Sequence, residues 1–231
     1  MIVWYVLKNT LLINAVLLSV ITNAYAETIE DGRAWLNLTL TGALPAENWR
    51  WYAELQPRLR EEGSHLDQVL LRPAIYYNLT KQSSVWAGYA HVITHPAGKS
   101  AFDEHRLWQQ YLYQFSPVGD LAIQSRTRLE QRFIENSDDT GYKLRQMFRV
   151  MMPSGIDSRL SWVLYDEYFI NLNQTDYGAQ KGFDQNRAFV GANWTITPQA
   201  KFEFGYLNQH VKTKHADLVN HVLSSTFNFS F

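Results

Sequence analysis

The chain has 231 residues, of which 46% are hydrophobic and 14% aromatic, and its formal net charge at pH 7 is −1. It contains no cysteine, which excludes disulfides, thiol nucleophiles and thiolate metal sites. The near-neutral charge argues against a nucleic-acid partner, which needs a strongly basic face. No cofactor or metal motif is present, and we expect neither to be bound.

The first 26 residues have the pattern of a cleaved secretory signal. A mostly apolar stretch over residues 11–22 follows Lys8, and the small residues Ala24 and Ala26 come just before the acidic Glu27. The apolar run is shorter than the ~20 residues that a membrane-spanning helix requires. We therefore expect cleavage after Ala26 and a single mature domain over residues 27–231.

Alternating apolar and polar residues then recur in segments that are separated by turn signals. The segments are residues 33–43, 49–60, 66–79, 85–94, 104–115, 121–134, 142–152, 159–170, 183–196, 200–210 and 220–231. The links between them alternate between short ones with Pro, Gly or Asp and longer polar ones. This asymmetry is typical of outer-membrane barrels, which have short periplasmic turns and longer external loops.

The last segment ends the chain on an aromatic residue. Its large apolar residues lie on one face of the predicted strand and its small polar residues on the other, as expected for a wall between lipid and lumen. A terminal Phe also resembles the signal that the bacterial barrel-assembly machinery reads. We assign this assembly signal to Phe227, Phe229 and Phe231.

The predicted fold is all-β, a transmembrane antiparallel outer-membrane barrel of ten to twelve strands. The eleven segments raise a difficulty, because single-chain bacterial barrels normally have an even number of strands. Residues 27–45 are therefore either an N-terminal plug or an extra strand. The expected location is the outer membrane of a Gram-negative bacterium. The expected partners are outer-membrane lipid, lipopolysaccharide and the barrel-assembly machinery.

Strand parity places many arginines on the inner face. An arginine on the lipid face at mid-membrane costs ~2–4 kcal/mol, so we expect these rows to face the lumen. The candidates are Arg50, Arg58, Arg60, Arg72, Arg106, Arg126, Arg128, Arg132, Arg145, Arg149 and Arg187. Their expected acidic partners are Glu54, Glu104, Glu130, Glu167 and Glu203.

Three functions are compatible with such an interior. The first is a narrow, porin-like channel or binding barrel for small anionic solutes. The second is a structural or interaction barrel whose lumen is sealed by salt bridges. The third is an outer-membrane hydrolase, but no catalytic constellation is found: His221 and Ser225, four residues apart on one strand, are ~13 Å apart. We expect a non-catalytic protein.

Short strings distributed along the chain resemble a known family. They are WLN (35–37), ELQPR (54–58), RLWQQ (106–110), RTRLEQR (126–132), DE (166–167), QNR (185–187) and GYLNQ (205–209). They are similar to the bacterial family called domain of unknown function 2490, and the similarity covers nearly all of the mature chain. The resemblance implies an outer-membrane barrel, and it carries over no activity or catalytic residue.

Overall fold

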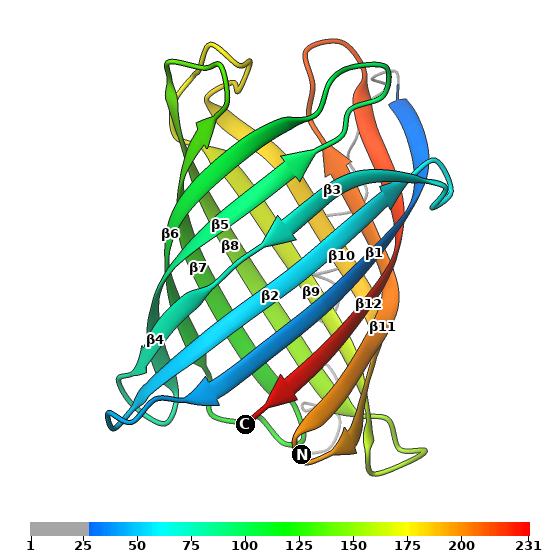
Figure 1. Cartoon of the computed structure of the whole chain (residues 1–231). Coiled ribbons are helices and arrows are strands. Elements are labelled where there is room, and N and C mark those ends of the chain that lie inside the picture. The colour runs from blue at the N-terminus through cyan, green and yellow to red at the C-terminus, as the bar shows by residue number, and fades with distance from the viewer. Residues whose placement is uncertain (1–27) are drawn as a thin grey trace, which may run out of the picture.

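Every alternating segment forms a β-strand in the computed structural model, which describes residues 28–231 (Figure 1). The strands are β1 (Thr28–Ala43), β2 (Trp49–Arg60), β3 (His65–Leu71), β4 (Ala74–Asn78), β5 (Ser83–Thr94), β6 (Phe102–Gln114), β7 (Ala122–Ile134), β8 (Thr140–Pro153), β9 (Leu160–Asn171), β10 (Gly182–Thr197), β11 (Ala200–Val211) and β12 (Asp217–Ser230). The described chain has no helix that is long and apolar enough to span a membrane.

β3 and β4 are two halves of one interrupted strand. Both halves pair with β2 on one side and with β5 on the other. The interruption falls at Arg72 and Pro73, where proline has no N–H to give to the ladder. Arg72 still exchanges two backbone hydrogen bonds with Glu54, of 2.8 and 3.1 Å. The wall therefore has eleven strand positions, and the predicted barrel of ten to twelve strands is confirmed.

The barrel closes between its first and last strands, which run parallel. β1 and β12 pair in register from Thr28 beside Asp217 to Thr41 beside Ser230, whereas all other neighbours are antiparallel. The predicted antiparallel barrel thus has one parallel pair, because an odd number of strands leaves the first and last pointing the same way. The plug alternative for residues 27–45 was wrong, since β1 is hydrogen-bonded into the wall on both sides. Closure pairs both edge strands.

The barrel has an apolar outside and a charged inside. Leu223, Val190 and Leu107 are 64%, 53% and 49% exposed on the outer face. Glu104 and Glu130, by contrast, are each only 2% exposed. This inversion follows from the two-residue period of a strand, which sends successive side chains to opposite faces. Such an arrangement suits a wall that contacts lipid outside and an enclosed polar lumen inside.

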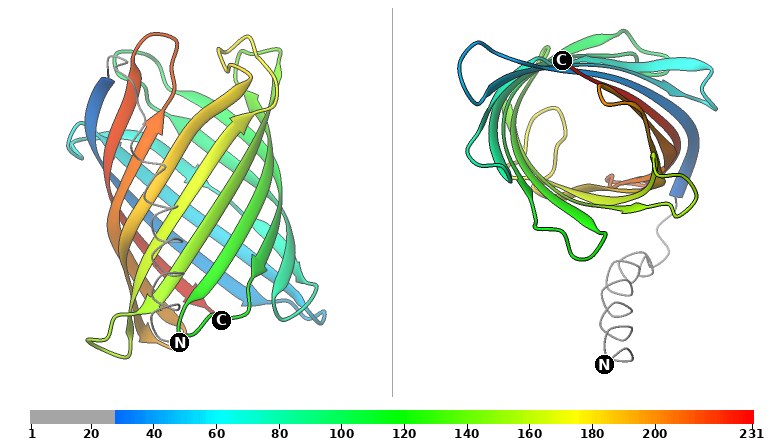
Figure 2. Two further views of the ribbon diagram at one scale, coloured as in Figure 1. Left: turned by 180° about the vertical axis from the view of Figure 1, so that it is seen from behind. Right: turned by 90° about the horizontal axis from the view of Figure 1, so that it is seen from below.

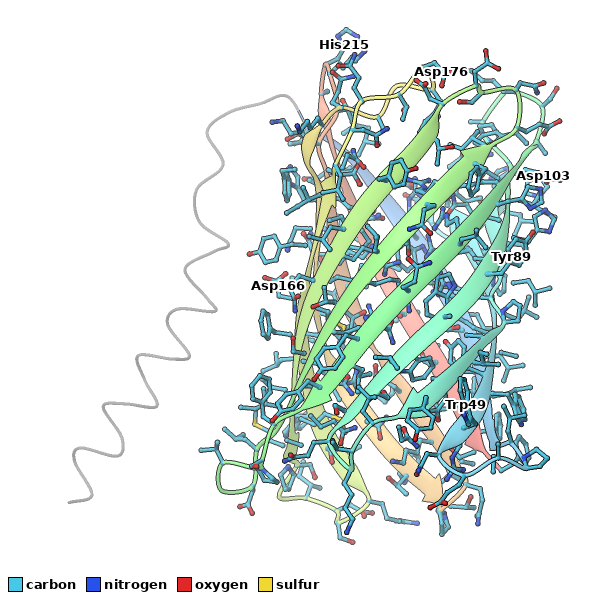
Figure 3. All side chains as sticks on the ribbon, turned by 90° about the vertical axis from the view of Figure 1, so that its left-hand side faces the viewer. Trp49, Tyr89, Asp103, Asp166, Asp176 and His215 are labelled. Atoms are coloured by element: carbon cyan, nitrogen blue, oxygen red, sulfur yellow. The ribbon has the colours of Figure 1, made fainter. Side chains whose placement is uncertain are left out.

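The two ends of the barrel differ in their connections (Figure 2). Short turns lie at the end that holds the C-terminus, where the Phe231 N–H donates to the Thr41 carbonyl at 2.9 Å and its ring stacks on Trp51. The longer connections lie at the other end, where Figure 3 shows Asp176 and His215. Thr28 also lies at this end, beside Asp217.

The connection formed by residues 172–181 is held over the long-loop end of the lumen. The Asp176 carboxylate accepts hydrogen bonds from the Ser137 hydroxyl and from the Asp138 N–H, the latter at 2.9 Å. A side chain at Gly141, whose strand neighbour Arg132 is inward, would collide with the Tyr177 hydroxyl. This connection therefore narrows the mouth of the barrel.

We expect Asp176→Asn to loosen this connection. Hydrogen bonds from the Ser137 hydroxyl and then from the Asp138 N–H lower the pKa of the Asp176 carboxyl. The stability that this carboxylate gives the connection is therefore fully present above its unfolded pKa of ~4 and is lost as pH falls through its folded pKa. At pH 7 the variant should be cut several-fold faster within residues 172–181 by added protease. Asp120→Asn, in a turn at the other end, is the control, and an unchanged cleavage rate for Asp176→Asn would contradict the contact.

Candidate functional site

The candidate site is a cluster of charged side chains at the middle of the lumen. Strands β2, β6, β7, β8, β9 and β10 each place inward residues there, because their alternate positions share the inner face. Burial of these groups is tolerable only where charges are paired and hydrogen-bonded. The pairing pattern therefore shows which charges are neutralised and which are not.

Glu104 on β6 accepts hydrogen bonds from two arginines, one on its own strand and one on the neighbouring β7. Arg106 on the same strand donates to it at 2.8 Å through two nitrogens, and Arg132 on β7 donates through Nη2 at 2.9 Å and through Nε. These fork-shaped contacts are the strong form of an arginine–carboxylate pair.

Glu130 and Glu167 are bridged by one arginine. Arg145 donates to Glu130 at 2.6 Å and to Glu167 at 2.9 Å. Arg126 reaches Glu167 from β7 at 2.7 Å, while Arg128 lies at a longer 3.8 Å from Glu130. Arg128 instead directs two donors to the Gln110 carbonyl oxygen, at 2.9 and 2.7 Å. The β7 arginines are thus unequally neutralised.

Two further acids complete the inner network. Glu54 accepts bonds of 2.5 Å from both Arg72 and the Tyr52 hydroxyl. Arg149 on β8 reaches across to Glu203 on β11, donating through Nη1 at 3.0 Å. The structure places all five predicted glutamates in buried positions with arginine partners.

Two of the predicted lumen arginines lie outside the central cluster. Arg50 is near the short-turn end of β2, beside Tyr76, and Arg60 is at the opposite end, where it pairs with the adjacent Glu61. Parity groups both with Arg58, but ten residues of strand extend ~33 Å. Sharing a face of one strand therefore does not bring these arginines together.

Aromatic rings provide contacts for several of the guanidinium groups. Arg58 and Arg187 lie over Trp35, at 4.1 and 4.9 Å from the ring centroid to Cζ, and Arg145 lies 4.5 Å from the Phe169 centroid. Neither Trp35 nor Phe169 was predicted as a site residue from the sequence. For Trp35 the available signal was its parity with the polar positions of the first segment.

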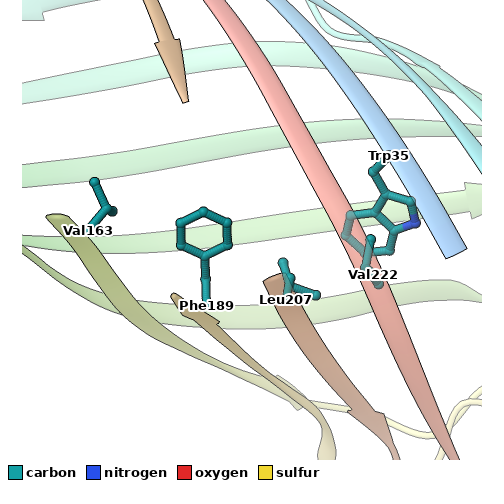
Figure 4. Packing of buried hydrophobic residues seen from close by; sticks show 5 residues of the cluster. All are labelled: Trp35, Val163, Phe189, Leu207 and Val222. Atoms are coloured by element: carbon teal, nitrogen blue, oxygen red, sulfur yellow. The ribbon is translucent and has the colours of Figure 1, made fainter. Parts of the chain in front are cut away.

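Trp35 is held in place by an apolar cluster on the neighbouring strands. It forms one cluster with Val222 on β12, Leu207 on β11, Phe189 on β10 and Val163 on β9, in which Val222 lies beside the Trp35 ring (Figure 4). Trp35 is 4% exposed. This packing fixes the ring against which Arg58 and Arg187 lie.

A cavity of about 140 Å³ lies among these groups. A cavity of this size holds several waters or one molecule the size of benzene. Six arginines but only two glutamates line it, namely Arg58, Arg72, Arg126, Arg128, Arg145 and Arg187 with Glu54 and Glu167. Trp35, Asn37, Ser224 and Thr226 bring β1 and β12 into the same lining. The cavity therefore has an excess of positive charge.

A contact between serine, histidine and glutamate lies in the connection between β2 and β3. Ser64 Oγ is 2.8 Å from His65 Nδ1, and Glu61 lies 3.0 Å from the same nitrogen. A catalytic relay needs the two ring nitrogens to contact different partners. The three exposed side chains thus lack the geometry of a hydrolase triad.

The assembly-signal residues lie at the short-turn end of the barrel. Phe227 packs on Phe202 of β11, with centroids 4.5 Å apart, and Phe231 stacks on Trp51 of β2. Phe229 pairs in register with Ala200. These contacts link the last strand to both of its sides.

Three known proteins or families are similar to this chain. Residues 32–220 match the family described as "Protein of unknown function (DUF2490)". An uncharacterized protein of Methylorubrum extorquens is 35% identical over 222 residues, covering 94% of this chain and 96% of that protein. The solved structure of the outer-membrane expressed OmpT of Vibrio cholerae aligns with a TM-score of 0.39 and 14% identity, covering 78% of this chain and 62% of that chain. The chain therefore belongs to the family of proteins of unknown function DUF2490, as its short motifs predicted.

Proposed function

We propose that this protein is an outer-membrane barrel whose arginine-rich lumen binds small anions and passes them slowly. The observation that supports this most directly is the charge around the central cavity, where six arginines face two glutamates. Rings of arginine favour anions over cations in pores, and low-dielectric walls strengthen the effect. The cavity therefore attracts anions.

The proposed pathway is narrow. Ion pairs cross the lumen between strands that are not neighbours, as from Arg126 on β7 to Glu167 on β9 and from Arg149 on β8 to Glu203 on β11. Lys143 on β8 also reaches Asp184 on β10, at 2.7 Å. Small barrels are generally filled in this way by side chains. We accordingly infer a low conductance and exclusion of large solutes.

The same crossing pairs favour a second candidate, a structural barrel with a sealed lumen. In that case the arginines and glutamates would serve only to fill and rigidify the interior. The two candidates differ in the role of the arginines without an acidic partner. Such arginines do not stabilise a sealed network of ion pairs, whereas an anion site requires them. For both candidates we infer a non-catalytic role, which the geometry of Ser64 and His65 supports.

The location is open to a direct test. We propose that the protein resides in the outer membrane after cleavage behind Ala26, and residues 1–26 lie outside those that the structure describes. Mass spectrometry of the protein from purified outer membranes should find Glu27 at the mature N-terminus. Recovery of the uncleaved chain from the inner membrane would contradict this location.

Anion preference should depend on the arginines that lack acidic partners. In planar bilayers under a KCl gradient, the wild-type barrel should show a reversal potential of the sign that chloride permeation produces. The double variant Arg58→Gln and Arg187→Gln should shift it toward zero, because two positive charges leave the cavity lining. Arg159→Gln, in the exposed turn beside Asp157, is the matched control. Cation preference in the wild type would overturn the anion proposal.

The buried network itself should be needed for stability. Glu130 contacts Arg145, Arg128 and Arg106, so Glu130→Gln leaves buried guanidiniums without their counter-charge. We expect a loss on the order of 3 kcal/mol in the free energy of unfolding, less where water enters. Urea unfolding followed by tryptophan fluorescence measures it. Asp157→Asn, an exposed pair at a turn, should have no measurable effect, and an equally small effect of Glu130→Gln would show that the network is dispensable.

A further inference from the structure

Two buried arginines beside Trp35 have no acidic partner. Arg58 and Arg187 are 8% and 9% exposed, and within residues 28–231 no carboxylate lies within 4.0 Å of either guanidinium. Among the described residues, Arg58 donates only to the side-chain oxygens of Gln56 and Gln68. Buried charges without a counter-charge are destabilising, and proteins normally pair them. A counter-ion from outside the chain would supply what the two groups lack.

Unused hydrogen-bond donors belong to residues that line the same cavity. Four buried N–H groups of residues that line the cavity have no hydrogen-bond partner in the described chain: Trp35 Nε1, Arg126 Nε, Arg128 Nη1 and Arg187 Nε. They come from β1, β7 and β10, so they approach the cavity from different parts of the wall. Buried donors are almost always satisfied in folded proteins, and a group of unsatisfied ones calls for a ligand or ordered water.

One unused acceptor lies among these donors. Asn37 Oδ1 is buried without a partner and belongs to the cavity lining, as do Ser224 and Thr226 with their hydroxyl groups. A ligand that fits all of these groups accepts several hydrogen bonds and carries negative charge. It can also have one protonated oxygen, whose O–H donates to Asn37 Oδ1.

We propose that the cavity is a binding site for one small divalent oxyanion of the phosphate and sulfate class. Two unpaired guanidiniums match a charge of −2, and four donors from three strands suit oxygens arranged in three dimensions better than a planar carboxylate. The cavity volume of about 140 Å³ admits an ion of this size and excludes bulky organic phosphates. The proposal rests on the proposed function only in that anions must reach the lumen.

Trp35 has two roles at this site. Its ring, fixed by Val222 and Leu207, holds Arg58 and Arg187 in place, and its indole N–H provides one of the free donors. Stacking on an aromatic face keeps a guanidinium oriented while leaving its N–H groups available to a ligand. Trp35→Phe removes the donor and keeps an aromatic ring, which separates the two roles.

The test is isothermal titration calorimetry on the full barrel, refolded in detergent. Inorganic phosphate and sulfate are titrated in separate arms, with chloride, acetate and succinate as the monovalent and planar comparisons. We expect phosphate or sulfate to bind at least tenfold more tightly than any of the other three. Arg187→Met should weaken that binding at least tenfold and Trp35→Phe by a smaller factor, while Arg159→Gln should leave it unchanged.

Thermal unfolding provides a second readout, because an arginine with a purely structural role would not make the unfolding temperature depend on phosphate. Because no carboxylate of residues 28–231 pairs with Arg187, Arg187→Met leaves no acid unpaired there. The variant should retain heat-modifiable migration and, without phosphate, should unfold at no lower temperature than wild type. Phosphate should raise the unfolding temperature of the wild type and not of the variant. If Arg187→Met does not refold, Arg58→Gln serves in its place with the same expectations.

The outcomes separate this inference from the proposed function. Three results would each overturn the oxyanion site. They are equal phosphate affinity of wild type and Arg187→Met, tighter binding of succinate than of phosphate and sulfate, and chloride binding as tight as that of phosphate and sulfate. An anion-selective reversal potential in KCl would still stand in those cases. Tighter phosphate than sulfate binding would support the site and assign the protonated oxygen to Asn37, and the reverse order would support it with a fully deprotonated ligand.

Discussion

The ion pairs between inward arginines and glutamates are the interactions on which the rest of this barrel depends. An arginine cannot face lipid at mid-membrane without a cost of ~2–4 kcal/mol, and inside the lumen it must be paired or solvated. Glu104, Glu130 and Glu167 each accept bonds or close contacts from at least two arginines. Shared carboxylates connect several strands at once, so the interior charges help to hold the wall together from inside.

The glutamates do not neutralise all of the lumen arginines, and the arginines without an acidic partner in the described chain lie together beside Trp35. Arginines around the edge of the cavity, such as Arg72 and Arg145, have carboxylates at hydrogen-bond distance. Arg58 and Arg187 have an indole ring instead. An aromatic face stabilises a guanidinium without neutralising its charge. Positive charge is therefore concentrated on one side of the cavity, beside β1, as the proposed anion site requires.

The odd strand count and the site are connected through β1. This strand closes the barrel by parallel pairing with β12, and the same strand carries Trp35 and Asn37 into the cavity lining. Parallel pairing is slightly less stable per residue than antiparallel pairing. Here it extends over nearly the full length of both strands, and the packing of Trp35 against Val222 reinforces the seam from inside.

The sequence by itself determined the architecture and the face of each charge, because a strand's period of two relates parity directly to inside and outside. It located the segments that became strands and selected the buried glutamates, but it gave residues 66–79 as one segment, which the structure divides at Arg72 and Pro73. Only the tertiary structure decided how the seam closes, which arginine meets which glutamate, and that Arg58 and Arg187 meet no carboxylate of residues 28–231. Those outcomes depend on register and on contacts across the lumen between residues such as Arg149 and Glu203, 54 positions apart, which no local pattern specifies.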